Sequence, residues 1–144
     1  MTRSTAPDPD REDSDVVGLH HIRIPVTDPW VSRDWYMTAV GLRPLLHEEE
    51  ENEVTGVVLV HPQGFVIGLH RDPDRASSLR GFALVGLSVD GLNQLHRLGA
   101  RLDDLGIVHA PAARGHLGWY LDAPDPDGIL LRFHTGATPD AEEA

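Results

Sequence analysis

The sequence of 144 residues contains no cysteine. Disulfide bonds, thiolate nucleophiles, zinc–thiolate sites and iron–sulfur clusters are therefore excluded for this chain. It also contains no lysine, because all twelve basic residues are arginine, and this excludes lysine Schiff bases and lysine general bases. Arginine remains available to bind an anionic group.

The sequence also lacks any apolar run long enough to span a bilayer, and residues 1–15 lack the apolar segment of a secretory signal. We therefore expect a cytoplasmic protein with no membrane partner. The formal net charge of -11 arises entirely in residues 1–15, 48–53 and 136–144. Because no basic face is left, no nucleic-acid partner is expected. Low hydropathy and clustered acidic residues predict disordered tails over 1–15 and 136–144.

The first half of the remaining chain shows a strand, a helix and three further strands. Ile22, Ile24 and Val26 alternate with polar residues and predict a strand over 16–26. Asp28 is a good N-cap and Pro29 a good first residue for a helix that ends before residue 41. Residues 42–50, 54–61 and 65–70 read as strands. The first half is thus predicted to be a βαβββ module over about 16–71.

The second half repeats this order after a predicted linker over 71–80. Strands are expected at 81–89, 101–109, 118–122 and 129–135, a helix at 91–98 and a loop at 110–115. The segment VTDP (26–29) aligns with VDGL (89–92) at an offset of 63, and HPQGFVIGLH (61–70) aligns with DPDGILLRFH (125–134) at an offset of 64. An internal repeat of this length indicates two related modules, about 16–71 and 80–135, in one domain over 16–135.

The string LHHIRIPVTDPWVSRDWYMTAVGL (19–42) and the closing DPDGILLRFH resemble the vicinal oxygen chelate superfamily. That superfamily includes glyoxalase I, extradiol dioxygenases, fosfomycin-modifying enzymes and bleomycin-binding resistance proteins. The resemblance implies an α+β fold of two tandem βαβββ modules, whose eight strands form a curved, partly open sheet around a cleft. It also implies a homodimer.

The resemblance places the four usual metal-ligand positions at His21, Gly68, Leu84 and Arg132. Glycine and leucine have no donor and arginine is a permanent cation, so no metal cofactor is predicted. An alternative is a divalent metal on relocated ligands, His21, His70 and His134, since strand alternation puts the last two on the same faces as Gly68 and Arg132. Against it, two residues of strand displace a ligand by about 6.5 Å. A slip of one residue would exchange His20 for His21.

Without a metal, the cleft-facing side chains suit a ligand that carries an anionic group. Arg23 and Arg132 are expected to bind it, with Ser88 beside them, unless they pair with acids such as Asp122 or Asp34. His21 is the first candidate for a general base and His70 or His134 the second, since histidines near arginines have lowered pKa values and stay neutral.

The remaining candidates are aromatic residues and a loop. Trp119 and Tyr120 point to opposite faces of one strand, so one of them should border the cleft as a wall for a planar ligand. Residues 110–118, with Arg114 and His116, form either a lid or a solvated connector. Two further sets are expected to be structural: Trp30, Trp35 and Tyr36 pack the first helix, and His47, His61, His96 and His109 lie at the surface or in turns.

Three functions follow. The favoured one is a metal-independent protein of this superfamily that modifies or sequesters a planar, partly anionic small molecule such as a natural product. The second is a divalent-metal isomerase, lyase or dioxygenase that uses the relocated histidines. The third is a non-catalytic domain for dimerisation or sequestration.

Overall fold

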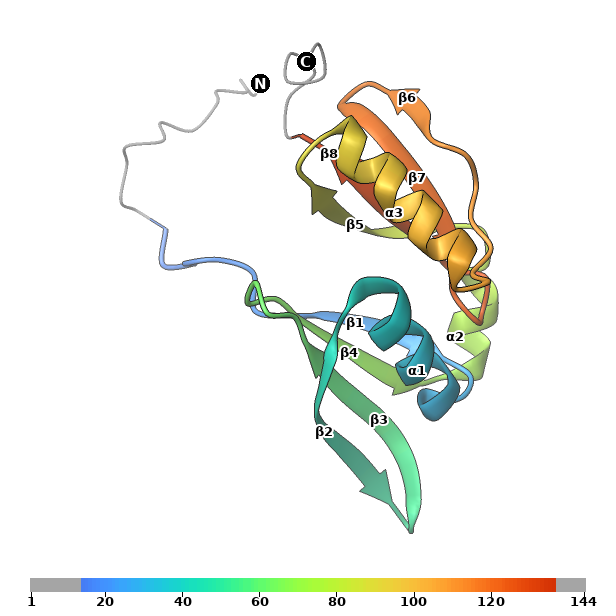
Figure 1. Ribbon diagram of the computed structural model, residues 1–144. Coiled ribbons are helices and arrows are strands. Elements are labelled where there is room, and N and C mark those ends of the chain that lie inside the picture. The colour runs from blue at the N-terminus through green and yellow to red at the C-terminus, as the bar shows by residue number, and fades with distance from the viewer. Residues whose placement is uncertain (1–13, 137–144) are drawn as a thin grey trace, which may run out of the picture.

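A computed structural model describes residues 14–136, so the predicted tails lie outside the described residues except for 14, 15 and 136. The chain forms two four-stranded sheets, one for each predicted module (Figure 1). The first module contains β1 (Ile22–Val26), α1 (Pro29–Val40), β2 (Arg43–Glu50), β3 (Glu53–Val60) and β4 (Val66–Arg71). After α2 (Pro73–Ser78), the second contains β5 (Ala83–Val89), α3 (Leu92–Asp104), β6 (Ala113–Gly115), β7 (Gly118–Pro124) and β8 (Leu130–Thr135).

The strand order shows that the two modules have the same topology. It is β1-β4-β3-β2 in one sheet and β5-β8-β7-β6 in the other, with the first strand parallel to the last in each. The α+β fold of tandem βαβββ modules is therefore confirmed, and the sheets are not closed. None of the helices in the described range is long and apolar enough to cross a membrane.

Three predicted elements were wrong. Residues 73–78 of the expected linker form α2, because Asp72 caps the backbone N–H of Arg75 and Pro73 follows at the first helical position. The helix predicted over 91–98 continues to Asp104, which leaves no strand over 101–109. Part of the predicted loop over 110–115 instead forms β6, which pairs with β7 through Ala113 and Tyr120.

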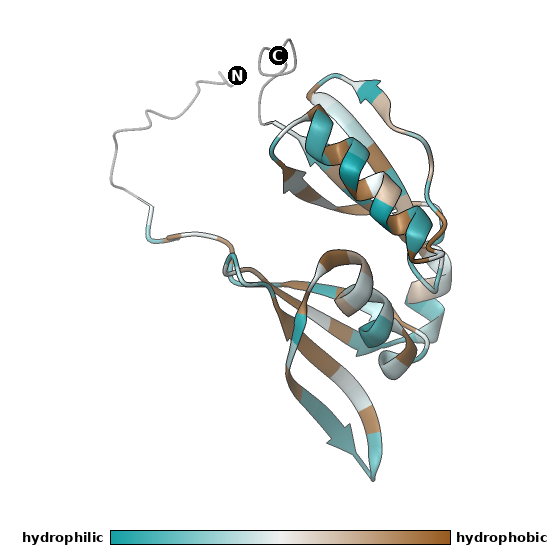
Figure 2. Ribbon diagram, viewed as in Figure 1, coloured by the Kyte–Doolittle hydropathy of each residue, from teal (hydrophilic) through white to brown (hydrophobic). Residues whose placement is uncertain are grey.

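Both long helices cover the same side of their sheets, and the core lies beneath them (Figure 1). Ile24 and Val26 of β1 and Leu131 and Phe133 of β8 are buried on this side. The opposite side of each sheet carries no helix, and we call it the helix-free face. The hairpin of β2 and β3 extends beyond α1, and all eight residues of β2 are exposed. Figure 2 shows the outer half of β2 as hydrophilic and much of β3 as hydrophobic.

A buried polar network joins the modules at one end of their junction. The Tyr36 hydroxyl on α1 donates to Asp125 Oδ2 at 2.8 Å, and Asp125 Oδ1 accepts the backbone N–H groups of Asp127 and Ile129. The carboxylate of Asp127 accepts from the backbone N–H and the hydroxyl of Thr27. The turn between β7 and β8 is thereby fixed against the start of α1. Burial raises the pKa of Asp125, and burial beside Asp125 raises the pKa of Tyr36 well above its ordinary value.

Candidate functional site

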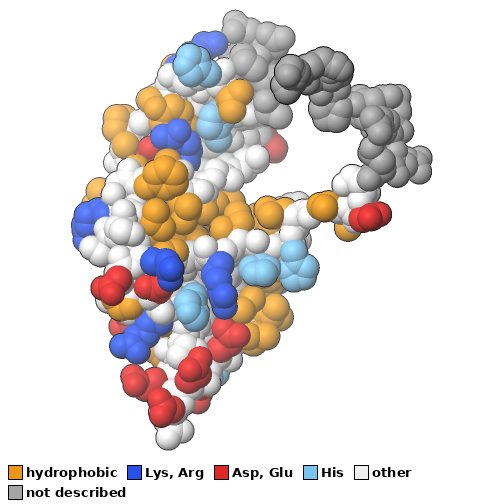
Figure 3. Space-filling view, turned by 180° about the vertical axis from the view of Figure 1, so that it is seen from behind, with side chains coloured by type: hydrophobic (Ala, Val, Ile, Leu, Met, Phe, Trp, Pro, Cys, Tyr) orange, Lys and Arg blue, Asp and Glu red, His pale blue; other side chains and the backbone are white. Residues whose placement is uncertain are grey.

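The helix-free faces carry most of the residues that the sequence analysis placed in the cleft. Strand alternation buries Ile67 and Leu69 under α1 and turns Gly68 and His70 to the opposite face. On the second sheet the same alternation presents Gly86, Ser88, Arg132 and His134. Figure 3 views the molecule from behind and shows arginine and histidine side chains next to hydrophobic ones there.

In each sheet an arginine pairs in register with a glycine. The arginine lies on the first strand of one module and on the last strand of the other. In the first module Arg23 of β1 pairs in register with Gly68 of β4. In the second, Gly86 of β5 pairs with Arg132 of β8. The repeat makes residue 23 equivalent to 86, and 68 equivalent to 132. Each sheet therefore offers one guanidinium beside an open position.

The first helix-free face contains a cavity of about 300 Å³. Its lining includes His20, His21, Arg23, Leu45, Glu48, Val58, Val66, Gly68 and His70. Arg23 is exposed, and none of the described residues forms a hydrogen bond or an ion pair with its guanidinium. No Cβ occupies position 68, so space remains beside this cation. The cavity thus holds an arginine whose charge is not neutralised within the described chain.

His70 and Glu48 lie next to each other in this cavity. The Nδ1 atom of His70 is buried, and none of the described residues forms a hydrogen bond with it. A Cβ added to Gly56 would lie 2.9 Å from Glu48 Oε1 and 3.9 Å from His70 Nδ1. The Glu48 carboxylate thus lies over Gly56 of β3, on the side of the sheet that carries the imidazole. The sequence analysis missed Glu48 because it lies in an acidic run that reads as a solvated turn.

On the second helix-free face, the positive charge of the arginine is neutralised by a carboxylate of the same sheet. Arg132 donates from Nε and from an Nη atom to the two oxygens of Asp122, at 2.8 and 3.0 Å. Its guanidinium carbon lies 3.9 Å from the centre of the Tyr120 ring, and Tyr120 stacks on His134 with a centroid distance of 5.9 Å. The hydrogen bonds that Arg132 donates to Asp122 raise the pKa of Arg132 above its ordinary value. Of the two alternatives for Arg132, pairing with Asp122 is the one the structure contains.

The two arginines do not share one cavity, contrary to the expectation of a common cleft within the chain. The residues around the 300 Å³ cavity all belong to the first module. His134 lies on the other sheet, and no group of three or more His, Cys, Asp or Glu side chains in the described part of the chain could hold a metal ion. The relocated set of His21, His70 and His134 is therefore not assembled.

The usual ligand positions of the superfamily do not fit a metal either. Gly68 and Leu84 offer no donor, and Arg132 brings a cation whose hydrogen bonds already go to Asp122. His21 remains, and its Nδ1 lies 2.9 Å from Nδ1 of His20 just before β1. Both histidines line the cavity, so either of them is placed to serve as the histidine of the first strand.

The aromatic and loop residues that were expected to border the cleft lie on or beside the hairpin of β6 and β7. Tyr120 lies on the helix-free face, whereas Trp119 packs against the core and lies under Arg114. His116 is exposed in the turn between β6 and β7, so residues 110–118 form a hairpin end and not an open loop.

The aromatic residues of α1 only partly match their prediction. Tyr36 is buried and Trp35 packs against the core, but Trp30 is partly exposed between Arg33 and His47. His109, predicted to lie at the surface or in a turn, lies in the irregular connection between α3 and β6. Its side chain is 13% exposed and bonded to Asp103 and to the Ala110 carbonyl.

The sequence of residues 18–133 matches the family model described as Glyoxalase/Bleomycin resistance protein/Dioxygenase superfamily. The match covers most of the chain, so the protein belongs to this superfamily. Among curated proteins, none matches the sequence significantly.

Solved structures with this fold include a fosfomycin resistance protein and an antibiotic binding protein. A glyoxylase/bleomycin resistance protein/dioxygenase domain from Frankia sp. EAN1pec is 24% identical, with a TM-score of 0.65, over 85% of this chain and 93% of that one. The fosfomycin resistance protein FosX from Listeria monocytogenes, complexed with Mn(II) and sulfate, is 16% identical, with a TM-score of 0.68, over 88% and 94%. TnmS3, an antibiotic binding protein from Streptomyces sp. CB03234, is 20% identical, with a TM-score of 0.68, over 85% and 99%.

Proposed function

We propose that this protein binds a planar, partly anionic small molecule on its helix-free faces, and that Arg23 binds the anionic group of that molecule. The observation that carries the proposal is the contrast between its two cleft arginines. Arg132 is neutralised by Asp122, whereas Arg23 has no carboxylate partner among the described residues. A guanidinium binds a carboxylate or enolate through two parallel hydrogen bonds, which suits an exposed arginine beside a glycine.

The surroundings of Arg23 suit a flat ligand with an apolar part. Leu45 and Val58 provide apolar surface in the same cavity, and Gly68 leaves room above the sheet. The antibiotic binding protein TnmS3 and the fosfomycin resistance protein FosX share this fold, which supports a natural-product ligand for the present chain as well.

Catalysis would need a base, and His70 is the strongest candidate in the structure. His70 lines the cavity, and none of the described residues forms a hydrogen bond with its Nδ1 atom, so no neighbour there competes with a bound ligand for the imidazole. His21 lines the same cavity and is the second candidate. Replacing His70 with Ala should abolish turnover without loss of binding if the protein is an enzyme, and should leave function intact if it only sequesters the ligand.

We further propose that the protein is a homodimer in which a second copy covers the helix-free face. The cavity is open, and large apolar side chains surround the bare sheets: Leu45 is 59% exposed and Phe82 56%. Sedimentation at micromolar concentration should give twice the monomer mass, and Leu45→Glu should reduce it to one copy. A monomeric native protein would contradict the dimer but leave the Arg23 site standing.

The experiment that tests the anion site compares two matched ligands, naphthalene-2-carboxylate and the uncharged naphthalene-2-carboxamide. Arg23→Gln should weaken carboxylate binding by roughly tenfold to a hundredfold, because a charge-assisted pair is lost, and should change carboxamide binding by less than about twofold. Arg97→Gln, on the exposed side of α3, is the control. If Arg23→Gln leaves the preference for the carboxylate unchanged, the proposal is wrong.

A further inference from the structure

The two ends of the junction between the modules differ, although the internal repeat makes them equivalent. At one end, Tyr36 and Asp125 form the buried network that fixes the turn after β7 against α1. Asp125 is only 5% exposed there. We call this the closed end. The opposite end lies between the turn after β3 and the start of α3.

The residues that close one end are replaced at the other. With the offsets of 63 and 64 residues, Gly99 takes the place of Tyr36, and His61 takes the place of Asp125. A glycine has no side chain to reach across the junction. His61 accepts a hydrogen bond from the backbone N–H of Gln63 in its own turn, at 3.0 Å, and makes none to the second module in the described structure.

A cavity of about 860 Å³ fills this unclosed end, which we call the open end. Figure 3 shows the molecule hollowed beside the segment that leads into β1, where the two modules part. Its walls come from both modules, with Val40, Phe65 and Val66 on one side and Leu87, Leu98 and Phe133 on the other. The volume lies in the range of small-molecule binding sites.

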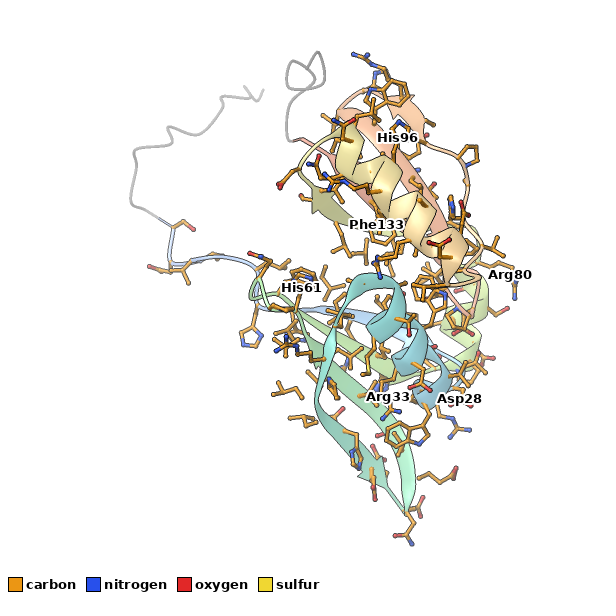
Figure 4. The ribbon with its side chains drawn as sticks, viewed as in Figure 1. Asp28, Arg33, His61, Arg80, His96 and Phe133 are labelled. Carbon is orange, nitrogen blue, oxygen red and sulfur yellow. The ribbon has the colours of Figure 1, made fainter. Side chains whose placement is uncertain are left out.

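The lining favours an aromatic ligand. His61 stacks on Phe65 with a centroid distance of 4.5 Å and an angle of 9° between the ring planes, which forms a flat wall. Phe133 lines the cavity from the other module, and Figure 4 shows His61 and Phe133 on opposite sides of the gap. Stacked and edge-on aromatic contacts add to the free energy gained from area burial alone.

The charges in the lining favour an uncharged ligand. One carboxylate, on Asp90, and one guanidinium, on Arg101, line the cavity, so their formal charges cancel. Arg101 already donates to the backbone carbonyls of Thr38 and Ala39, at 3.3 and 3.1 Å. Gln63 and Gln94 provide neutral hydrogen-bonding groups. We propose that the open end of the module junction is a second binding site, for an uncharged aromatic molecule of drug-like size. Its cavity adjoins the cavity of Arg23, because His20, His21 and Val66 line both, but Arg23 lines only the smaller one.

The test uses the uncharged aromatic probe N-phenyl-1-naphthylamine and measures its binding to the full chain by equilibrium dialysis. The native protein should bind it saturably at one site per chain. Leu98→Gln should weaken binding by about tenfold, because it removes apolar contact from the wall at little change in size. Leu105→Gln, an exposed leucine at the end of the same helix, should leave the affinity unchanged.

Two further variants keep the result interpretable. Phe65→Leu removes the stacked ring and should weaken binding if Leu98→Gln does not fold. Arg23→Gln should leave probe binding unchanged, because Arg23 lines only the other cavity. Absence of saturable binding, equal affinity of Leu98→Gln and Leu105→Gln, or loss of binding in Arg23→Gln would each overturn the second site while leaving the anion site open to its own test.

Discussion

At the scale of single residues, the side chain on the neighbouring strand determines whether each arginine forms an ion pair within the chain or stays available to a ligand. Arg132 is opposite Asp122 on β7 and becomes part of an ion pair stacked on an aromatic ring. Arg23 lies on the edge strand β1 opposite Gly68, and Val58, which pairs with Gly68 from the other side, also offers no charge. The sequence showed both arginines and named Asp122 as a possible partner. It could not decide between pairing and ligand binding, because that depends on register.

The hydroxyl of Tyr36 should be worth a measurable part of the stability. Tyr36→Phe removes the one donor to Asp125 Oδ2 and leaves that oxygen buried without it. We expect the free energy of unfolding to fall by about 1–3 kcal/mol, the usual cost of a buried unsatisfied acceptor. Urea denaturation at neutral pH measures this loss.

The control for this variant is Tyr120→Phe, which removes a hydroxyl from a half-buried ring on the helix-free face. It should change the free energy of unfolding by less than about 0.5 kcal/mol. Equal stability of Tyr36→Phe and the native protein would show that the network does not hold the modules together.

At the scale of elements, capping signals were as informative as apolar periodicity. The prediction of α1 was confirmed because Asp28 accepts from the N–H groups of Trp30 and Val31, and Gly41, with a φ of 85°, ends the helix. The short α2 was missed because it depends on its cap and not on an apolar stripe. Gly99 was read as the end of a helix, but a Cβ there would lie 3.3 Å from Leu121, so this glycine allows close packing in the middle of α3.

The connection from α3 to β6 should stabilise the fold more at low pH than at high pH. Burial lowers the pKa of His109, but hydrogen bonds to the Ala110 carbonyl and Asp103 outweigh this effect and raise it above 6.5. A raised folded pKa adds stability that is fully present below 6.5 and is lost as the pH rises through the folded value. His109→Asn should therefore lower Tm more at pH about 5.5 than at pH about 8.5.

The matched control for this prediction is His96→Asn, because His96 is exposed on α3, the helix before this connection. Its effect on Tm should be small and the same at both pH values. An equal loss at both pH values in His109→Asn would mean that only its packing matters.

At the scale of the whole molecule, the repeat predicted two modules of the same βαβββ type and the equivalence of their faces. It did not predict how the modules sit against each other. That arrangement depends on contacts such as Tyr36 with Asp125, which are 89 residues apart and differ between the two ends. Neither the closed end nor the open end could be read from a pattern that describes each module by itself.

Divalent metal ions should leave the stability of the protein nearly unchanged. The superfamily ligand positions contain a glycine, a leucine and an ion-paired arginine, and the described residues include no group of three or more His, Asp or Glu side chains that could hold an ion. Excess Mn(II), Fe(II), Co(II), Ni(II) or Zn(II) should shift Tm by less than about 2 °C relative to a chelator-treated sample. One ion per chain with a rise of several degrees would instead support a metal-dependent enzyme.

The closed end also sets how the molecule can deform. Two sheets joined firmly at one edge would rotate about that edge, with the closed end as the hinge and the open end as the mouth. Such a rotation would have to break or carry along the hydrogen bonds from Arg101 on α3 to the carbonyls of Thr38 and Ala39 on α1. A small rotation moves atoms little at Asp125 but much more at Phe65 and Leu87. Filling the mouth would fix the angle between the two sheets. It would thereby set the distance at which the helix-free faces present Arg23 and Arg132, and so couple the two cavities mechanically.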